Sequence, residues 1–322
     1  MRVVVIGGTG HIGTSLVPEL VTQGHEVVVL SRGAREPYRP HGAWAWVERR
    51  TVDRDAGDAD GTFPALVADL EPDVVIDLVC FTERSATLLA NALDGRVGHL
   101  LHCGTIWVHG PSTEVPTRED APRRPFGDYG IAKAAIESDL LRRSRTGGLP
   151  TTVIHPGHIS GRGWVPINPA GHLDLAVFQD LADGRRITLP GLGMETLQHV
   201  HAADVAGVFL AAIANRSVAV GECFHAVAST ALTLRGYAES VATWFGREAD
   251  LAFLPWDEWA RTVTPHEANA THDHIAHSPH CSMEKADRLL GFRPRYTAWQ
   301  TVVSALEALV EDGRLTRTRS GA

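Results

Sequence analysis

A cluster of glycines between a β-branched run and a helical pattern constrains this chain more than any other stretch. The residues Val5-Ile6-Gly7-Gly8-Thr9-Gly10-His11-Ile12-Gly13 follow apolar residues that begin at position 3. Glycines at such a strand-to-helix turn permit a tight bend, close approach of a phosphate and close packing of the helix on the strand. The free N–H groups at the helix start then face the anion. The pattern predicts a dinucleotide site; the alternative is a purely structural turn.

Composition and charge narrow the functional classes. The 322 residues are 44% hydrophobic and carry a formal net charge of −8, which gives no electrostatic footprint for nucleic acid or an anionic membrane. No apolar stretch approaches the ~20 residues of a membrane span, and the expected first strand leaves no room for a signal peptide. The widely spaced Cys80, Cys103, Cys223 and Cys281 are typical of reduced core thiols. We expect a cytoplasmic protein that acts on a small molecule, with neither nucleic acid nor membrane as partner.

The first half of the chain alternates apolar strand-like runs with helical patterns. This alternation predicts an α/β fold, a doubly wound parallel sheet covered on both faces. The expected strands are 3–6, 27–30, 44–47, 74–79, 100–103 and 151–154, and the expected helices are 14–22, 63–70 and 83–93.

The pattern changes after residue 155, where Pro, Gly and His become frequent and long loops separate helical segments. We therefore expect a dinucleotide-binding domain over 1–154, with a return segment near 201–228, and a smaller, mostly helical substrate lobe over 155–322. The expected elements here are helices 173–181, 203–213, 234–244, 283–290 and 298–309, a strand at 223–227 and a loop at 270–281.

A tyrosine and a lysine lie at helical spacing in a chain that has only two lysines and four tyrosines. The pair is Tyr129 and Lys133, in Asp128-Tyr129-Gly130-Ile131-Ala132-Lys133. Residues i and i+4 share one face of a helix, so the lysine cation is expected to lower the pKa of the phenol. A phenol tuned in this way is a general acid or base for a carbonyl or an alcohol. The alternative is an ordinary amphipathic helix start.

With these motifs in order, the chain resembles the extended short-chain dehydrogenase/reductase family, in its epimerase/dehydratase-like branch. The resemblance covers nearly the whole chain and implies a Rossmann fold. The matching segments are 7–13, 102–110, 129–133, 155–161, 199–205 and 288–294.

The resemblance also implies roles for individual residues. Tyr129 transfers a proton, Thr105 at the end of the fifth strand polarises the substrate, and Lys133 holds the nicotinamide ribose. The implied cofactor contacts are Gly7, Gly10, His11, Ile12, Gly13, Leu78 and His155. Helices 83–93 and 129–142 are those through which family members often form homodimers.

The end of the second strand bears on the choice of cofactor. An NAD-preferring fold usually carries an acidic residue about 20 positions after the glycines, whereas this chain has Ser31-Arg32. Arg32 offers charge-assisted contacts to a 2′-phosphate, and Ser31 offers a further hydrogen bond. We expect NADP, with NAD as the alternative. Asp53 matches the family position that faces the adenine amine, or is a surface acid.

Departures from the family pattern bear on the substrate. Leu197 stands where sugar-nucleotide epimerases usually carry an arginine for the diphosphate, and Ile106-Trp107 replace the Asp-Glu pair of a 4,6-dehydratase. Burying a diphosphate without cations is costly, so we expect a different substrate, with Arg162 and Arg186 as substitute cations if the expectation is wrong. The expected substrate residues are Trp107, His158, Trp164, Asn168 and His199.

A histidine-rich stretch runs from His266 to His280. Its spacing matches no compact zinc motif, so we expect no metal but a loop over the pocket with one or two imidazoles near the substrate.

Together these features predict an NADP-dependent oxidoreductase that interconverts a carbonyl and an alcohol on a small polar or natural-product-like substrate. The alternatives are a sugar or nucleotide-sugar epimerase with tightly bound NAD(P), and a non-catalytic cofactor-sensing regulator.

Overall fold

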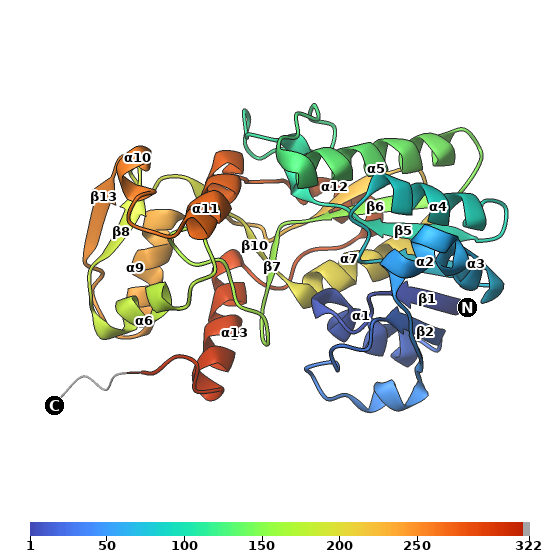
Figure 1. Ribbon diagram of the computed structural model, residues 1–322, viewed down its shortest axis with the longest axis horizontal. Coiled ribbons are helices and arrows are strands. Elements are labelled where there is room, and N and C mark those ends of the chain that lie inside the picture. Colours follow the sequence, from blue (N-terminus) through green and yellow to red (C-terminus); the bar gives the residue numbers. More distant parts are fainter. Residues whose placement is uncertain (318–322) are drawn as a thin grey trace.

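A seven-stranded parallel sheet forms the centre of the computed structural model, which describes residues 1–317. Its strand order is β11-β6-β5-β4-β1-β2-β3, so the chain starts in the middle of the sheet and winds outward in both directions (Figure 1). The strands are β1 (Arg2–Ile6), β2 (Glu26–Ser31), β3 (Glu48–Thr51), β4 (Val74–Asp77), β5 (His99–Cys103), β6 (Thr151–Pro156) and β11 (Cys223–Ala226). The predicted doubly wound α/β fold is confirmed.

Helices cover both faces of this sheet because the apolar strands alternate between two cores. Val3 and Val5 of β1 pack in one core and Val4 and Ile6 in the other. The first core is covered by α1 (His11–Thr22), α7 (Ala202–Ala214) and α12 (Glu284–Leu290), and the second by α3 (Thr62–Asp69), α4 (Glu83–Leu93) and α5 (Gly127–Arg145). Two short helices, α2 (Arg54–Asp60) and α8 (Arg216–Ala219), complete this part of the chain.

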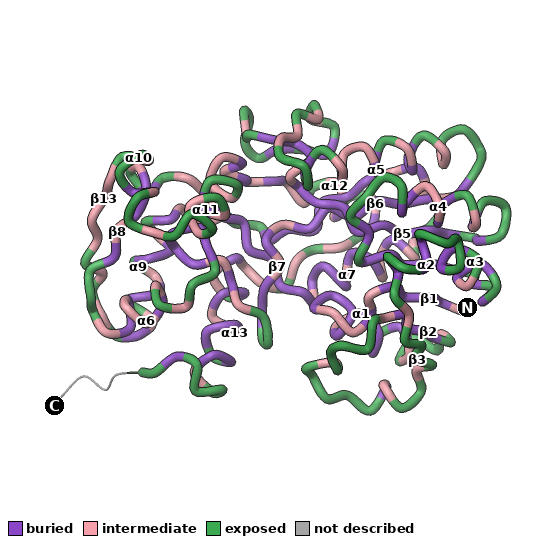
Figure 2. Tube along the Cα trace, in the orientation of Figure 1, coloured by how far each residue is buried: buried purple, intermediate pink, exposed green. Residues whose placement is uncertain are grey.

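A third core lies in the other half of the molecule, where helices gather around short strands (Figures 1 and 2). Tyr237, Phe178 and Trp259 are buried at its centre. Its helices are α6 (Ala176–Asp183), α9 (Leu234–Trp244), α10 (Trp256–Trp259), α11 (Pro265–His277) and α13 (Ala298–Glu311). The short strands of this half are β7 (His158–Ser160), β8 (Ile187–Pro190), β9 (Thr196–Leu197), β10 (His199–His201), β12 (Leu232–Thr233) and β13 (Leu251–Leu254).

Two expected elements are wrong. Residues 44–47 form no strand: a 3-10 helix, η1 (Gly42–Trp46), places Trp44 against the first core, and the edge strand is the polar β3 that follows. The expected loop at 270–281 is mostly helix α11, which begins with a capping box between Thr264 and Glu267 and a proline in its first turn. In both segments local capping sets the structure, by the His41 side chain at the start of η1 and by Thr264 and Glu267 at the start of α11.

Among residues 1–317, no helix combines the length and the apolar character needed to cross a membrane.

Candidate active site

The glycine turn between β1 and α1 is shaped by contacts that exclude larger residues. Gly7 has a φ of +83°, and a Cβ on Gly13 would lie 2.1 Å from the Gly8 carbonyl oxygen. Helix α1 begins after Gly10 without a side-chain cap. The first-turn amides of His11, Ile12 and Gly13 therefore face outward as donors at the positive end of the helix dipole. This cradle fits the pyrophosphate of a dinucleotide.

Aromatic side chains from distant segments lie beside this turn. The ring of Trp164 stacks on that of His11, with centroids 4.8 Å apart, and the hydroxyl of Tyr38 contacts His11 Nδ1. A Cβ on Gly163 would lie 2.4 Å from the Tyr38 ring, so the 161–164 turn needs glycine there. Trp164, which is expected at the substrate, lies against the glycine turn through its contact with His11.

The end of β5 carries the predicted catalytic hydroxyl groups. Thr105 is buried and caps a 3-10 helix, η2 (Ile106–His109), by accepting a hydrogen bond from the Trp107 amide at 3.3 Å. The hydroxyl group of Thr105 lies close enough to that of Tyr129 to lower the pKa of the phenol. Tyr129 lies in the first turn of α5, so a strand end and a helix start bring the two hydroxyl groups together.

Lys133 lies one turn further along α5 and is 2% exposed. Its Nζ donates to the carbonyl oxygens of Cys80 and Cys103 at 2.7 and 2.6 Å, at the ends of two neighbouring strands. Two of the three ammonium protons are thereby used within the protein. The Phe81 ring, 56% exposed, has its centroid 5.1 Å from Nζ.

The phenol pKa contradicts the expected lowering by Lys133. Tyr129 is 40% exposed as a whole residue, but its hydroxyl group is largely desolvated; this desolvation, together with the nearby Cys103 thiol, raises the pKa of Tyr129 to about 12, and Thr105 offsets only part of the rise. The lysine ammonium is directed at two carbonyl groups, and its distance to the Tyr129 ring centroid is 5.9 Å. At neutral pH Tyr129 therefore keeps its proton.

The residues expected to select the cofactor lie at the end of β2 and beyond β3. Arg32 is exposed, and the described part of the chain gives it no ion-pair partner. Ser31 accepts a long hydrogen bond of 3.4 Å from the Gly33 amide. Asp53 is exposed and caps α2 by accepting from the Ala56 amide. Leu78, buried next to β4, donates its amide to the Ile6 carbonyl beside the glycine turn.

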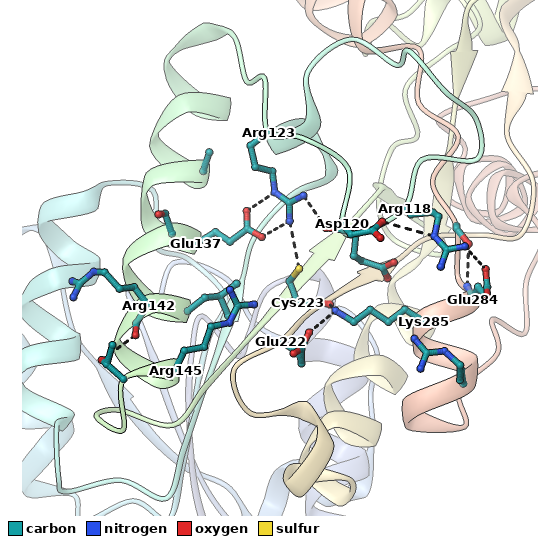
Figure 3. A pocket seen from close by; sticks show the side chains of 17 residues that line it. Arg118, Asp120, Arg123, Glu137, Arg142, Arg145, Glu222, Cys223, Glu284 and Lys285 are labelled. Carbon is teal, nitrogen blue, oxygen red and sulfur yellow. Dashed lines mark hydrogen bonds and ion pairs between the residues drawn. The ribbon is translucent and has the colours of Figure 1, made fainter.

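His155 is fully buried and has both ring nitrogens bonded within the protein. Nδ1 accepts from the Thr105 amide at 3.0 Å, so the neutral ring carries its proton on Nε2, which contacts Glu137 Oε1 at 3.0 Å. Glu137 in turn pairs with Arg123, whose Nε lies 2.9 Å from its Oε2 (Figure 3). Despite burial, His155 and Arg123 hold the pKa of Glu137 below its usual range. Any contact of His155 with a cofactor therefore falls to its backbone.

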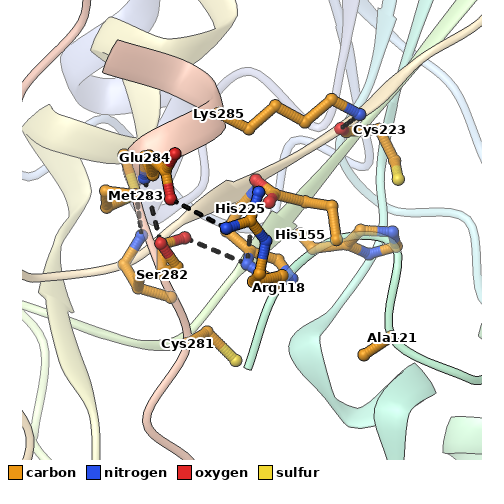
Figure 4. A network of polar contacts seen from close by, with 12 residues as sticks. Arg118, Ala121, His155, Cys223, His225, Cys281, Ser282, Met283, Glu284 and Lys285 are labelled. Atoms are coloured by element: carbon orange, nitrogen blue, oxygen red, sulfur yellow. Dashed lines mark hydrogen bonds and ion pairs between the residues drawn. The ribbon is translucent and has the colours of Figure 1, made fainter. Parts of the chain in front are cut away.

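Arg123 and Glu137 of this relay border a cavity of about 860 Å³ between α5, β11 and α12 (Figure 3). Close by, His225 Nδ1 lies 3.1 Å from the Ser282 carbonyl, and the His155 and His225 rings are 6.3 Å apart (Figure 4). Neither Thr105 nor Tyr129 lines this cavity. The predicted site thus does not coincide with it.

The expected substrate residues separate into two groups. Trp107 contacts Tyr129 edge to face at 5.7 Å, and His158 and His199 have ring centroids 5.9 Å apart on paired strands β7 and β10. Asn168 instead uses its side-chain amide within its own loop. The amide nitrogen contacts His172 Nδ1, and the amide oxygen accepts from the backbone N–H groups of Ala170 and His172.

The sequence reasoning left open which histidines of the 266–280 stretch reach the site. His277 stacks between Trp107 and Phe126, at 4.4 and 4.1 Å, and His274 meets Trp107 edge to face at 5.4 Å. His266 and His272 are exposed. The spacing of three residues between His274 and His277 was the available signal, but it has this meaning only on a helix.

Several buried nitrogens at this site have no partner among the described residues. They include His158 Nε2, His199 Nδ1 and His277 Nε2. Each buried, unpaired polar atom costs about 1–3 kcal/mol, so such atoms call for an explanation.

Two groups of potential metal ligands among the described residues already hold a cation of the protein. Asp77, Cys80 and His102 lie together, and Arg54 Nη1 is 2.7 Å from Asp77 Oδ1. In the other group, Glu137, His155 and Cys223, the guanidinium of Arg123 contacts both Glu137 and Cys223. A guanidinium in place makes either group a poor metal site.

Curated relatives include both reductases and epimerases. The chain is 29% identical over 266 residues to 2′-dehydrokanamycin reductase of Streptomyces kanamyceticus, covering 81% of this chain and 71% of the relative. It is 30% identical over 236 residues to UDP-glucose 4-epimerase of Mycolicibacterium smegmatis, covering 66% of this chain and 73% of the relative.

Solved structures and a family model agree with the fold. UDP-glucose 4-epimerase of Thermotoga maritima, solved with UDP-glucose, superposes with a TM-score of 0.75 at 18% identity, over 97% of this chain and 99% of that one. The model of the NAD dependent epimerase/dehydratase family matches residues 3–225, which include the glycine turn, Thr105, Tyr129 and Lys133. The chain belongs to this family and is an NAD(P)-dependent enzyme of the extended short-chain dehydrogenase/reductase type.

Proposed function

We propose that the chain is an NADP-dependent oxidoreductase that reduces a carbonyl group of a small, polar, natural-product-like substrate to an alcohol. The observation that carries the proposal is that Thr105 at the end of β5 and Tyr129 at the start of α5 lie together, with Lys133 one turn away on α5. When bound, the dinucleotide supplies the hydride.

The residues of the chain polarise the carbonyl group, supply the proton and hold the cofactor. The Thr105 hydroxyl donates a hydrogen bond to the carbonyl oxygen, and Tyr129 delivers a proton to that oxygen as the alcohol forms. A pKa of about 12 keeps Tyr129 protonated at neutral pH, as a general acid requires. Lys133 offers its remaining N–H to the nicotinamide ribose, while the amides after Gly10 hold the pyrophosphate.

Arg32 supports NADP over NAD, because it is exposed, unpaired in the described chain and placed just beyond β2. One carboxylate oxygen of Asp53 caps α2 by accepting from the Ala56 amide, and the second oxygen remains for the adenine amine. The likeness to 2′-dehydrokanamycin reductase supports net reduction.

The second candidate is an epimerase, favoured by the UDP-glucose 4-epimerases among the relatives. Leu197 argues against a nucleotide-sugar substrate, because it is fully buried where those enzymes usually have a cation. Arg162 and Arg186 are ion-paired with Glu311 and Asp250, which removes them as ready substitutes. A cofactor-sensing regulator without turnover is the third candidate.

Net oxidation of NADPH, followed at 340 nm with a panel of keto-sugars and keto-cyclitols, separates these candidates. We expect oxidation with at least one carbonyl compound. Tyr129→Phe should lower kcat by about three decades while the Kd for NADP stays within two-fold, because only the proton donor is lost. Interconversion of epimers without net oxidation would instead favour the epimerase, and near-normal activity of Tyr129→Phe would remove the assigned acid.

A further inference from the structure

Four histidines form a cluster beside the Trp107–Tyr129 pair. His158 comes from β7, His199 from β10, and His274 and His277 from α11. Their rings are close: His158 is 5.3 Å from His274 and 5.9 Å from His199, and His277 stacks on Trp107. We call these four residues the histidine cluster.

One nitrogen of each ring is fixed by the backbone, and this bond sets the tautomer. His158 Nδ1 accepts from the Gln198 amide at 3.2 Å, so its proton is on Nε2. The other three donate to carbonyl groups: His199 Nε2 to Ile167 at 3.1 Å, His274 Nδ1 to Gly171 at 2.8 Å and His277 Nδ1 to Asp273 at 2.5 Å.

The opposite nitrogens present a defined set of hydrogen-bonding groups. His158 Nε2 is a buried donor, whereas His199 Nδ1 and His277 Nε2 are buried acceptors, and all three lack a partner among residues 1–317. The three residues are at least nine-tenths buried. Burial of unpaired donors and acceptors is unfavourable unless a bound molecule supplies their hydrogen-bond partners.

The cluster is electrically neutral at physiological pH. Burial lowers the pKa of all four histidines, that of His199 to about 3. A neutral imidazole nitrogen with a free lone pair accepts from a hydroxyl or an ammonium group and repels a phosphate oxygen. Arg162 and Arg186 already form ion pairs, with Glu311 and Asp250.

We infer that the histidine cluster is the substrate-recognition subsite and that it takes an unphosphorylated saccharide or cyclitol bearing hydroxyl and amino groups. This inference rests on the proposed function for the reacting centre at Tyr129. His158 donates to a hydroxyl oxygen, while His199 and His277 accept from O–H or N–H groups of the same ring system.

Isothermal titration calorimetry of the NADP-saturated protein tests the inference without requiring turnover. The probes are kanamycin, glucosamine and UDP-glucose. We expect kanamycin or glucosamine to bind and UDP-glucose not to bind. Tight binding of UDP-glucose, or binding of none of the three, would overturn the inference even if NADPH oxidation with some carbonyl compound upholds the proposed function.

Variants locate the binding. His277→Phe and His158→Phe keep an aromatic ring but remove both nitrogens, and each should weaken saccharide binding about ten-fold with NADP affinity within two-fold. His266→Phe, on the exposed surface of the same helix, is the matched control and should change nothing. If a phenylalanine variant fails to fold, His277→Gln replaces it and should retain part of the affinity. Unchanged saccharide binding in folded variants at both positions contradicts the inference.

Discussion

At the scale of single residues, we propose that cofactor choice depends on the exposed cation at the end of β2. Arg32 lies one residue beyond the last residue of β2, Ser31, and has no ion-pair partner among the described residues. A 2′-phosphate placed there gains a charge-assisted contact, whereas the ribose of NAD gains none. The Arg32 guanidinium can pair with the 2′-phosphate because no acidic side chain of the described residues already pairs with it.

Arg32→Asp should therefore shift the preference from NADP toward NAD. The variant loses one charge-assisted contact, worth about 1.5–3 kcal/mol, and adds a charge that repels the phosphate, so NADP affinity should fall by about one to two decades. Titration calorimetry with both dinucleotides measures the change. Arg35→Asp is the matched control and should have a smaller effect. Equal affinity of the wild type for NAD and NADP would show that Arg32 does not select.

The sequence predicts Thr105, Tyr129 and Lys133 as catalytic residues, which stays a prediction, whereas the state of the phenol could not be read from the sequence. Tyr129 and Lys133 are four residues apart, so one helix fixes their relation, and the structure places Thr105 close to Tyr129. The partners of Lys133 are carbonyl groups at Cys80 and Cys103, which a local pattern cannot reveal. The expected pKa was therefore wrong in sign.

At the scale of elements, the buried relay joins α5 to the ends of β5 and β6. Glu137 projects from α5, His155 from β6, and the backbone of Thr105 follows β5. Arg123, which precedes α5, neutralises the carboxylate. The relay fixes the strand end that carries Thr105, the threonine proposed to be catalytic.

Glu137→Gln should lower the free energy of unfolding by about 3 kcal/mol, because it leaves Arg123 without its charge partner in a largely buried place. Urea unfolding monitored by circular dichroism measures the loss. Glu222→Gln removes the partner of Lys285, a carboxylate that is 40% exposed, and serves as the control, with an expected loss below about 1 kcal/mol. Equal losses in the two variants would mean that the relay contributes no more than a surface ion pair.

Helices α4 and α5 lie side by side on one face of the sheet and offer the surface that the resemblance assigns to a homodimer. Ile131 on α5 is 53% exposed. If this face is the interface, Ile131→Asp should convert a dimer to a monomer, since it buries a charge in an apolar contact. Size-exclusion chromatography with light scattering reads the mass. A control variant, Val218→Asp, lies on α8 with 43% exposure and should leave the mass unchanged; a wild-type monomer would refute the dimer.

Elements with a strong period were predictable, whereas those set by local caps or distant contacts were not. The bounds of α4 and α9 agree with the expected 83–93 and 234–244, because their apolar positions recur at helical spacing. Helix α11 has a polar, histidine-rich sequence, and the signal that starts it is the Thr264–Glu267 capping box. Recognising that box would have placed His274 and His277 on one helical face.

At the scale of the whole molecule, an unusual number of neutral histidines is built into the interior. Burial lowers the pKa of His11, His109 and His199 to about 3 and of His99 and His201 to about 4. Each ionises near its ordinary pKa of about 6.5 once the chain unfolds. Below that pH the unfolded state binds more protons than the folded state, so stability falls as pH falls.

The protein should therefore be acid-labile well above the range in which carboxylates titrate. Each of these five histidines removes about 1 kcal/mol of stability between about pH 6.5 and 5.5, so together they remove about 5 kcal/mol, a large part of the 5–15 kcal/mol typical of folded domains. Urea unfolding at pH 7.5, 6.5 and 5.5 measures the dependence, which should be steep below about pH 6.5. His99→Gln, which removes one buried imidazole next to Thr152, should reduce the loss between pH 6.5 and 5.5 by about 1 kcal/mol. A free energy of unfolding that does not change between pH 6.5 and 5.5 would show that these histidines are not held neutral in the folded state.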